Sequence, residues 1–441
     1  MSIRKLLWAR FRKLSCFVHK WAGIVSSLVL FVVCLSGTIY VFQDDVIKYL
    51  NKDKFRLENI SGGEAISIEE AIEISSKATG VAPRSISIPA SDRSAWSANV
   101  VKDDGNRRGT NYLLNQYEGT VMEQSGLKGQ EFFMTVFRLH RWLLLDTSIG
   151  RPIVGWATII MIVILISGLV IWLPRKIKNI YRGLKIKWSG GSFRLAYDLH
   201  NVLGFYVAPL VLIMALSGLF WSFDWSRNAI YKTLGLEAAS QPGGGGAQQG
   251  RTHQGSGLQS RRHDGSGQGL MSQDGAGRGL GQGQRKGQGQ GQRNGSGALN
   301  IRQRDAFHEE NAEGRGEAAL VKDYLAYSAL LAIADKELDY KGNVILSVPD
   351  SSSSTVTITK TKSGFFAGTA KDQIEISRVS GDIVSVNRFS DLPFNQQIAS
   401  SIKAIHTGEI FGSFSKILYF LACLIATSLP VTGLIMWIKK W

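Results

Sequence analysis

Four long apolar stretches constrain this chain more than any other feature of its sequence. They cover residues 21–42, 152–173, 202–223 and 414–438. About 20 apolar residues in a helix cross the hydrocarbon core of a bilayer, where unpaired backbone groups exclude irregular structure. The sequence therefore predicts a membrane α-helical protein with four transmembrane helices. The first stretch is too long for a signal peptide and has no obvious cleavage site, so we expect a retained anchor.

The positions of lysine and arginine predict the topology. The formal net charge is +16, and basic residues without any acidic ones lie before residue 21, between residues 175 and 194, and after residue 438. This is the positive-inside pattern of membrane proteins, so we expect the lipid bilayer as a partner and no nucleic acid. Both termini and residues 174–201 are expected in the cytoplasm, with residues 44–151 and 224–413 on the opposite side.

The two segments on the opposite side show the same order of predicted elements. Residues 67–79 and 324–336 are predicted helices, and Ser67 with Glu70 has the order of a capping box. Strand-like stretches follow at 85–88, 96–101 and 112–115, and again at 343–348, 355–361 and 373–377, with turns at 118–119 and 380–381. We expect one α+β domain in each segment. Neither segment contains cysteine, so neither carries a disulfide.

Residues 241–300 form an insert of low complexity inside the second segment. It consists mostly of Gly, Gln, Ser and Arg and has almost no large apolar residues. Such a composition cannot bury a core, so we expect disorder. His253, His263 and His308 lie in or just after this insert and are expected to be solvated.

The two halves of the chain repeat each other. His19 and His200 are each followed, eighteen residues later, by the glycine of a Ser-Gly pair. His140 precedes the Ser167-Gly168 pair as His406 precedes the Thr432-Gly433 pair. Two copies with the same course through the membrane are parallel repeats, related by an axis along the membrane normal.

The repeat places four histidines at membrane edges in two symmetric pairs. His19 pairs with His200 on the cytoplasmic side, and His140 pairs with His406 on the other side. Ionisable groups at membrane depth are costly and usually functional. Two imidazoles that meet across helices suit axial ligation of a haem iron, whereas zinc needs further ligands that these helices scarcely offer. The alternative for each histidine is contact with water or lipid headgroups.

The glycines of the four Ser/Thr-Gly pairs lie level with these histidines. At about 1.5 Å per residue, Gly37 lies roughly 27 Å from His19, at the far end of the same helix. Gly218 lies equivalently on the third helix, and Gly168 and Gly433 lie near the inner ends of the second and fourth. Missing side chains there would leave room for a flat macrocycle; close packing of helices by small residues is the alternative.

Three cations lie within one helical turn of His140 or His406, namely Arg138, Arg141 and Lys403. Haem propionates are anions, so we expect at least one of these cations to pair with a propionate. Contact with lipid headgroups is the alternative.

These features resemble the PepSY-associated transmembrane family, whose members are often called iron-regulated membrane proteins. The similarity rests on the paired His-x-x-x-Gly helices, on SIEEAIEIS, YEGTVME and VSGDIVS in the soluble segments, and on HTGEIFG at residues 406–412. It covers nearly the whole chain except residues 241–300. The resemblance implies a bacterial inner-membrane protein with two periplasmic PepSY-like domains. Some members resemble haem-containing siderophore reductases, which implies His19, His140, His200 and His406 as haem ligands.

The histidine pairs predict a transmembrane electron-transfer protein with two b-type haems, and the resemblance implies a membrane ferric-siderophore reductase. Electrons would pass from an unidentified cytoplasmic donor to a ferric siderophore in the periplasm. A PepSY-domain binding or regulatory protein and a transporter, or transporter accessory, remain the alternatives. The expected divisions are residues 1–43, 44–138 (first PepSY-like domain), 139–174, 175–195 (basic loop), 196–223, 224–405 (second PepSY-like domain with the insert) and 406–441.

Overall fold

The computed structural model describes residues 3–57, 64–102, 106, 108–124, 126–174, 180–236, 324–350 and 352–439. The insert at 241–300 and the histidines at 253, 263 and 308 lie outside these residues. Within the described ranges, four helices are long and apolar enough to cross a membrane. They are α1 (Ile3–Tyr40), α6 (Thr147–Trp172), α8 (Ser192–Ser222) and α12 (Gly412–Ile438). The four predicted spans are therefore confirmed as helices.

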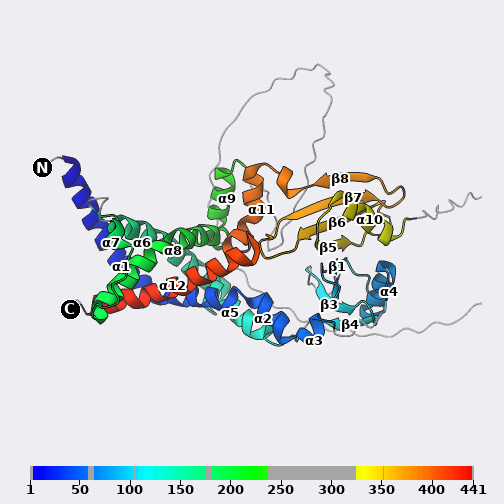
Figure 1. Ribbon diagram of the computed structural model, residues 1–441, viewed down its shortest axis with the longest axis horizontal. Coiled ribbons are helices and arrows are strands. Elements are labelled where there is room, and N and C mark those ends of the chain that lie inside the picture. The colour runs from blue at the N-terminus through cyan, green and yellow to red at the C-terminus, as the bar shows by residue number, and fades with distance from the viewer. Residues whose placement is uncertain are drawn as a thin grey trace, which may run out of the picture. The chain divides into compact units, whose positions relative to one another are not determined.

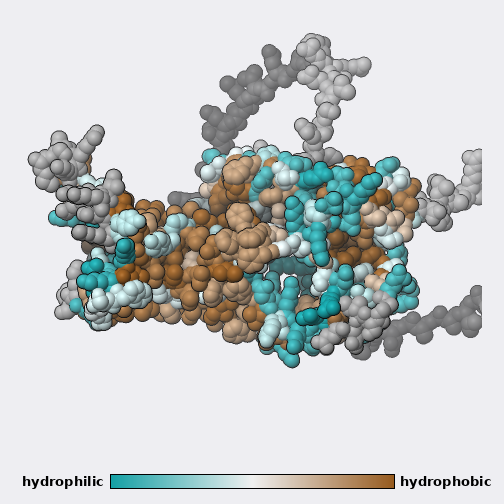
Figure 2. All heavy atoms as spheres, in the orientation of Figure 1, coloured by the Kyte–Doolittle hydropathy of each residue, from teal (hydrophilic) through white to brown (hydrophobic). Residues whose placement is uncertain are grey.

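The four long helices pack together, and each contacts two of the others. Helices α1 and α8 both pack against α6 and against α12 (Figure 1). The buried residues between α6, α8 and α12 are small or aliphatic, as is typical of membrane helices that approach closely: Leu165, Val207, Ala208, Val211, Ala422 and Ala426. Hydrophobic surface covers these helices, whereas hydrophilic surface gathers over the strands (Figure 2).

Two shorter helices carry His140 and His406. Helix α5 (Gln130–Trp142) packs against α1, and α11 (Phe394–Thr407) packs against α8. The predicted boundaries at residues 138 and 405 fall inside these helices, because each histidine lies near the end of a helix that begins outside the bundle. Other short helices are α2 (Gln43–Leu50), α3 (Lys52–Phe55), α7 (Ile180–Gly183), α9 (Asp224–Thr233) and a 3-10 helix at Phe389–Asp391.

Two further helices, α4 and α10, each precede four strands in the soluble segments. Helix α4 (Ile68–Thr79) precedes β1 (Ser85–Ile88), β2 (Trp96–Val100), β3 (Thr110–Asn115) and β4 (Thr120–Glu123). Helix α10 (Tyr327–Glu337) precedes β5 (Gly342–Ser347), β6 (Thr355–Lys362), β7 (Lys371–Ser377) and β8 (Ile383–Asn387). The capping box of Ser67 and Glu70 is present at the start of α4, as predicted. Strands β4 and β8 were not predicted; each follows one of the predicted turns.

The sequence predicts two separate α+β domains, but the strands of both segments form one antiparallel sheet. Its order is β4-β3-β2-β1-β5-β6-β7-β8, and β1 pairs with β5 from Ser85 opposite Ser347 to Ile88 opposite Val344. One buried core also joins the segments, since Ile68 of α4 packs with Leu330 of α10. The physical reason is that β1 and β5 would each leave an unpaired edge, and pairing them removes both edges.

A buried lysine in α12 ties this helix to the segment after α1. Lys416 Nζ lies 2.6 Å from Asp45 Oδ2 and 3.7 Å from Glu409 Oε1. The side chain of Lys416 is 11% exposed, whereas that of Asp45 is 62% exposed. If the ion pair is broken, water can therefore solvate the Asp45 carboxylate, whereas the Lys416 ammonium stays largely shielded from water.

We expect Asp45→Asn to destabilise the protein more than Lys416→Met. Removing the aspartate leaves a buried ammonium with one distant carboxylate, which costs about 1–3 kcal/mol. Removing the lysine leaves an aspartate that water can solvate, and methionine fills the apolar volume. Thermal unfolding of both variants in the same detergent measures the difference. A larger loss for Lys416→Met would show that packing of the lysine side chain, and not its charge, matters at this position.

Candidate functional site

The structure brings the four predicted histidines together in two pairs. The ring centroids of His19 (α1) and His200 (α8) are 6.1 Å apart, with the ring planes at 89°. Those of His140 (α5) and His406 (α11) are 6.3 Å apart, with the planes at 51°. In each pair, the two side chains come from different halves of the chain.

The Nδ1 atom of each histidine faces a neighbouring helix. Nδ1 of His19 lies 2.9 Å from the carbonyl oxygen of Ile164, that of His140 lies 2.9 Å from Val33 O, and that of His406 lies 2.9 Å from Met214 O. A carbonyl oxygen only accepts hydrogen bonds, so Nδ1 of each of these rings carries the proton. In the neutral ring, Nε2 is then unprotonated and keeps its lone pair for a metal.

The hydroxyl of each Ser/Thr-Gly pair contacts the same Nδ1 atom. The distances from Nδ1 to the hydroxyl oxygen are 3.2 Å for His19 and Ser167, 3.3 Å for His140 and Ser36, 3.2 Å for His406 and Ser217, and 3.0 Å for His200 and Thr432. Each hydroxyl donates its own hydrogen to a backbone carbonyl of its helix. It therefore accepts from the imidazole, which fixes the same tautomer in all four rings, His200 included.

The four predicted glycines each lie against one histidine ring. A Cβ atom on Gly37 would lie 3.1 Å from Cε1 of His140, and on Gly168 it would lie 3.0 Å from Cε1 of His19. For Gly218 and His406 the distance is 2.9 Å, and for Gly433 and His200 it is 3.4 Å. The space that each glycine leaves is thus taken up by the edge of an imidazole. We call each carbonyl, hydroxyl and glycine set an imidazole socket.

His140 and His406 are half-buried although α5 and α11 lie outside the four spans. Burial lowers the pKa of His140. Burial, together with the neighbouring His140, lowers the pKa of His406 to about 4. Both rings are therefore neutral near pH 7, and a neutral imidazole is the form that binds a metal. The indole of Trp221 also lies beside His406, with ring centroids 5.3 Å apart.

The three predicted propionate partners differ in their surroundings. Arg138 and Lys403 are exposed. Arg141 is half-buried and lies over the rings of Phe137 and Trp142. Burial and the nearby Arg151 lower the pKa of Arg141, and within the described residues it forms no ion pair with a carboxylate. Of the three, Arg141 is therefore the cation in need of an anionic partner.

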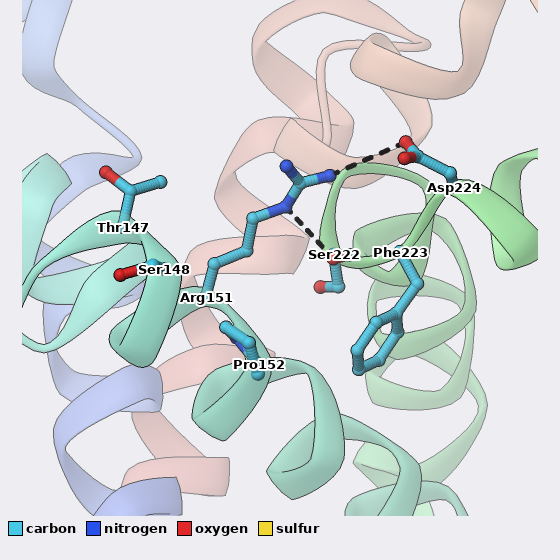
Figure 3. Close-up of a pocket in the computed structure, with 7 residues that line it drawn as sticks. All are labelled: Thr147, Ser148, Arg151, Pro152, Ser222, Phe223 and Asp224. Atoms are coloured by element: carbon cyan, nitrogen blue, oxygen red, sulfur yellow. Dashed lines mark hydrogen bonds and ion pairs between the residues drawn. The ribbon is translucent and has the colours of Figure 1, made fainter. Parts of the chain in front are cut away.

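A cavity of 330 Å³ opens beside the end of α8 (Figure 3). Arg151 lies across it and donates from Nε to the carbonyl oxygens of Trp221 and Ser222, at 2.9 and 3.0 Å. Its guanidinium also faces Asp224 at 3.9 Å. The lining residues include none of the four histidines. The arginine here neutralises the carbonyl end of a helix and is already partnered.

Two buried indole N–H groups have no hydrogen-bond acceptor among the described residues, and sequence reasoning missed both. They belong to Trp142, two residues after His140, and to Trp437, one turn after Gly433. A buried indole N–H usually has a partner. Each donor therefore lies within one helical turn, along its own helix, of a residue of one histidine site. The only signal in the sequence is the short spacing from His140 and from Gly433.

Each histidine pair offers two imidazoles. Across the described ranges, no three side chains of His, Cys, Asp or Glu gather where they could hold a metal ion. A tetrahedral zinc site with three or four protein ligands is therefore not formed in that part of the chain. Two opposed imidazoles are instead the number that a planar macrocycle leaves open on its metal.

Comparison with known proteins identifies the family of this chain. No curated protein shows significant similarity to the chain. The model of the PepSY-associated transmembrane region matches residues 17–440, which includes the four apolar stretches of the sequence and all four paired histidines. The chain is thus a multi-pass membrane protein and belongs to the PepSY-associated transmembrane family.

Proposed function

We propose that this protein carries electrons across a bacterial inner membrane through two b-type haems and reduces a ferric siderophore in the periplasm. The observation that carries the proposal is the pair of imidazoles at each end of the bundle, held by four similar sockets. The proposal includes two parallel repeats, with both termini in the cytoplasm and the sheet in the periplasm.

The separation of the paired rings supports ligation of one metal by both members of a pair. With metal–imidazole bonds of about 2.0 Å, and a ring centre about 1.1 Å behind the nitrogen, two opposed imidazoles have centroids about 6 Å apart. The centroids in this protein are 6.1 and 6.3 Å apart. His19 and His200 would hold one haem, and His140 and His406 the other. When bound, haem b supplies reversible one-electron chemistry.

The sockets hold the four imidazoles in one tautomer and one orientation. Each carbonyl and hydroxyl holds Nδ1–H, so that the ring cannot turn and Nε2 stays unprotonated. Each glycine lets the ring lie close to its neighbouring helix. The apolar core between α6, α8 and α12 keeps water out of the region between the two pairs.

The proposal puts the substrate and the electron donor at opposite faces of the membrane. A ferric siderophore holds Fe³⁺ through hard oxygen ligands, and one electron converts it to Fe²⁺, which such ligands bind less strongly. We propose that this transfer occurs on the side of His140 and His406. The donor would be a separate cytoplasmic protein or a diffusible reductant.

An absorbance spectrum of the purified protein tests the proposal. Reduction with dithionite should give the sharp bands of bis-histidine haem, with about two haems per chain by the pyridine haemochrome assay. A binding or regulatory protein, or a transporter without redox activity, would give no such bands. A preparation grown with haem precursor that still lacks haem absorbance would refute the proposal.

Arg141→Gln is expected to lower the midpoint potential of the haem at His140 and His406 more than that of the other haem. A cation that pairs with a propionate neutralises its negative charge, and that negative charge would otherwise stabilise the oxidised, more positive iron centre. Removal of the cation therefore favours the oxidised form and lowers the midpoint potential. Spectroelectrochemical titration of the variant measures both potentials. Lys403→Gln, which removes an exposed cation, serves as the control. If no single substitution of Arg138, Arg141 or Lys403 moves a potential, these cations contact lipid headgroups and not a propionate.

A further inference from the structure

The loop between β6 and β7, residues 363–370, lies directly against the connection between α11 and α12. A Cβ atom on Gly368 would overlap the carbonyl oxygen of Ile410. One on Gly412, which has a positive φ of 62°, would lie 2.6 Å from the carbonyl oxygens of Phe365 and Ala367. The backbone N–H of Phe414 donates to Phe365 O at 3.3 Å. Backbone therefore packs on backbone here, and glycine is required on both sides.

This loop exposes aromatic side chains. Phe365 is 52% and Phe366 is 68% exposed, although both are large and apolar. Their rings contact each other with centroids 4.9 Å apart, and Phe366 lies 5.5 Å from Phe414 in the first turn of α12. Phe411 and Phe414 are also exposed, at 62% and 44%. The contacting rings of Phe365, Phe366 and Phe414 form one apolar patch, which we call the Phe patch.

The composition of the loop matches a lipid contact. Residues 363–370 read Ser-Gly-Phe-Phe-Ala-Gly-Thr-Ala and contain no charge, whereas residues 101–109, in the corresponding loop of the first segment, include five charged residues: Lys102, Asp103, Asp104, Arg107 and Arg108. The Phe patch is continuous with α12, whose membrane span begins at Gly412. Aromatic side chains are enriched where a span meets the lipid headgroups.

We infer that Phe365 and Phe366 insert into the membrane interface at the start of α12, so that lipid covers the Phe patch. The sheet is thereby anchored to the bilayer through the β6–β7 loop, next to the connection that leads from His406 to α12. Lipid contact then restrains residues 408–411, which follow α11. This contact does not depend on a bound cofactor.

Photo-crosslinking tests the inference in the full chain. Benzoylphenylalanine in place of Phe366 is irradiated in native membranes, and the adducts are identified by mass spectrometry. We expect lipid adducts, roughly fivefold more abundant than from the same probe in place of Val384. Val384 is a matched control because it is 57% exposed and lies on β8 of the same sheet. Adducts to a second copy of the chain or to another protein, or equal lipid adducts at both positions, would overturn the inference.

A second measurement uses the double variant Phe365→Ser, Phe366→Ser in lipid nanodiscs of phosphatidylcholine and phosphatidylglycerol. Loss of the anchor should speed amide hydrogen exchange in residues 408–411 several-fold, while exchange in β1 and β5 stays unchanged. Unchanged exchange in residues 408–411 would overturn the inference. Haem content reports separately on the proposed function, since it depends on the histidines and not on these phenylalanines.

Discussion

Replacing His200 with alanine is expected to remove about half of the haem from the purified protein. His200 supplies one of the two imidazoles in its pair, with a ring centroid 6.1 Å from that of His19. Alanine leaves His19 without its partner, whereas His140 and His406 keep theirs. The pyridine haemochrome assay gives the haem content per chain, and redox titration should show that one of two transitions is lost.

The neighbouring residue provides the control for this variant. Asn201 on the same helix is partly exposed, and its side-chain amide donates to the Tyr197 carbonyl, so Asn201→Ala should keep both haems. His406→Ala should remove the other transition and complete the assignment. Equal loss of both haems from folded His200→Ala protein would contradict the pairing of His19 with His200.

Gly218→Val is expected to abolish the haem at His140 and His406 as completely as His406→Ala does. A Cβ atom at Gly218 would lie 2.9 Å from Cε1 of His406, closer than carbon atoms normally approach. Valine adds two further methyl groups at this point, so the imidazole must leave its socket. Haem content should fall by about half, and the loss should fall on one redox transition alone.

A second glycine of α8 separates this effect from general loss of helix packing. At Gly204 a Cβ atom would meet only Leu429 side-chain atoms, at 3.7 Å, which is an ordinary contact. Gly204→Ala should therefore retain both haems. Retention of both haems by Gly218→Val as well would show that the sockets do not position the ligands.

The local pattern of the sequence determined much of this protein. Four apolar stretches predict four spans because a bilayer leaves few other structures for such segments. The order of Ser67 and Glu70 predicts the start of α4 because the capping box is a local interaction. The repeat of histidines and Ser/Thr-Gly pairs, read at 1.5 Å per residue, placed His19 level with Gly168 and His140 level with Gly37.

Contacts between distant residues were decided by the tertiary structure alone. The pairing of β1 with β5 could not be predicted, because each strand has the same local pattern whether it ends a sheet or continues one. The glycines could be read as room for a macrocycle or as helix packing, and only the fold shows that an imidazole edge fills each gap. Lys416 looks like an ordinary interfacial lysine until Asp45 is brought beside it. Local pattern encodes an element's type and face, but its partner depends on packing across hundreds of residues.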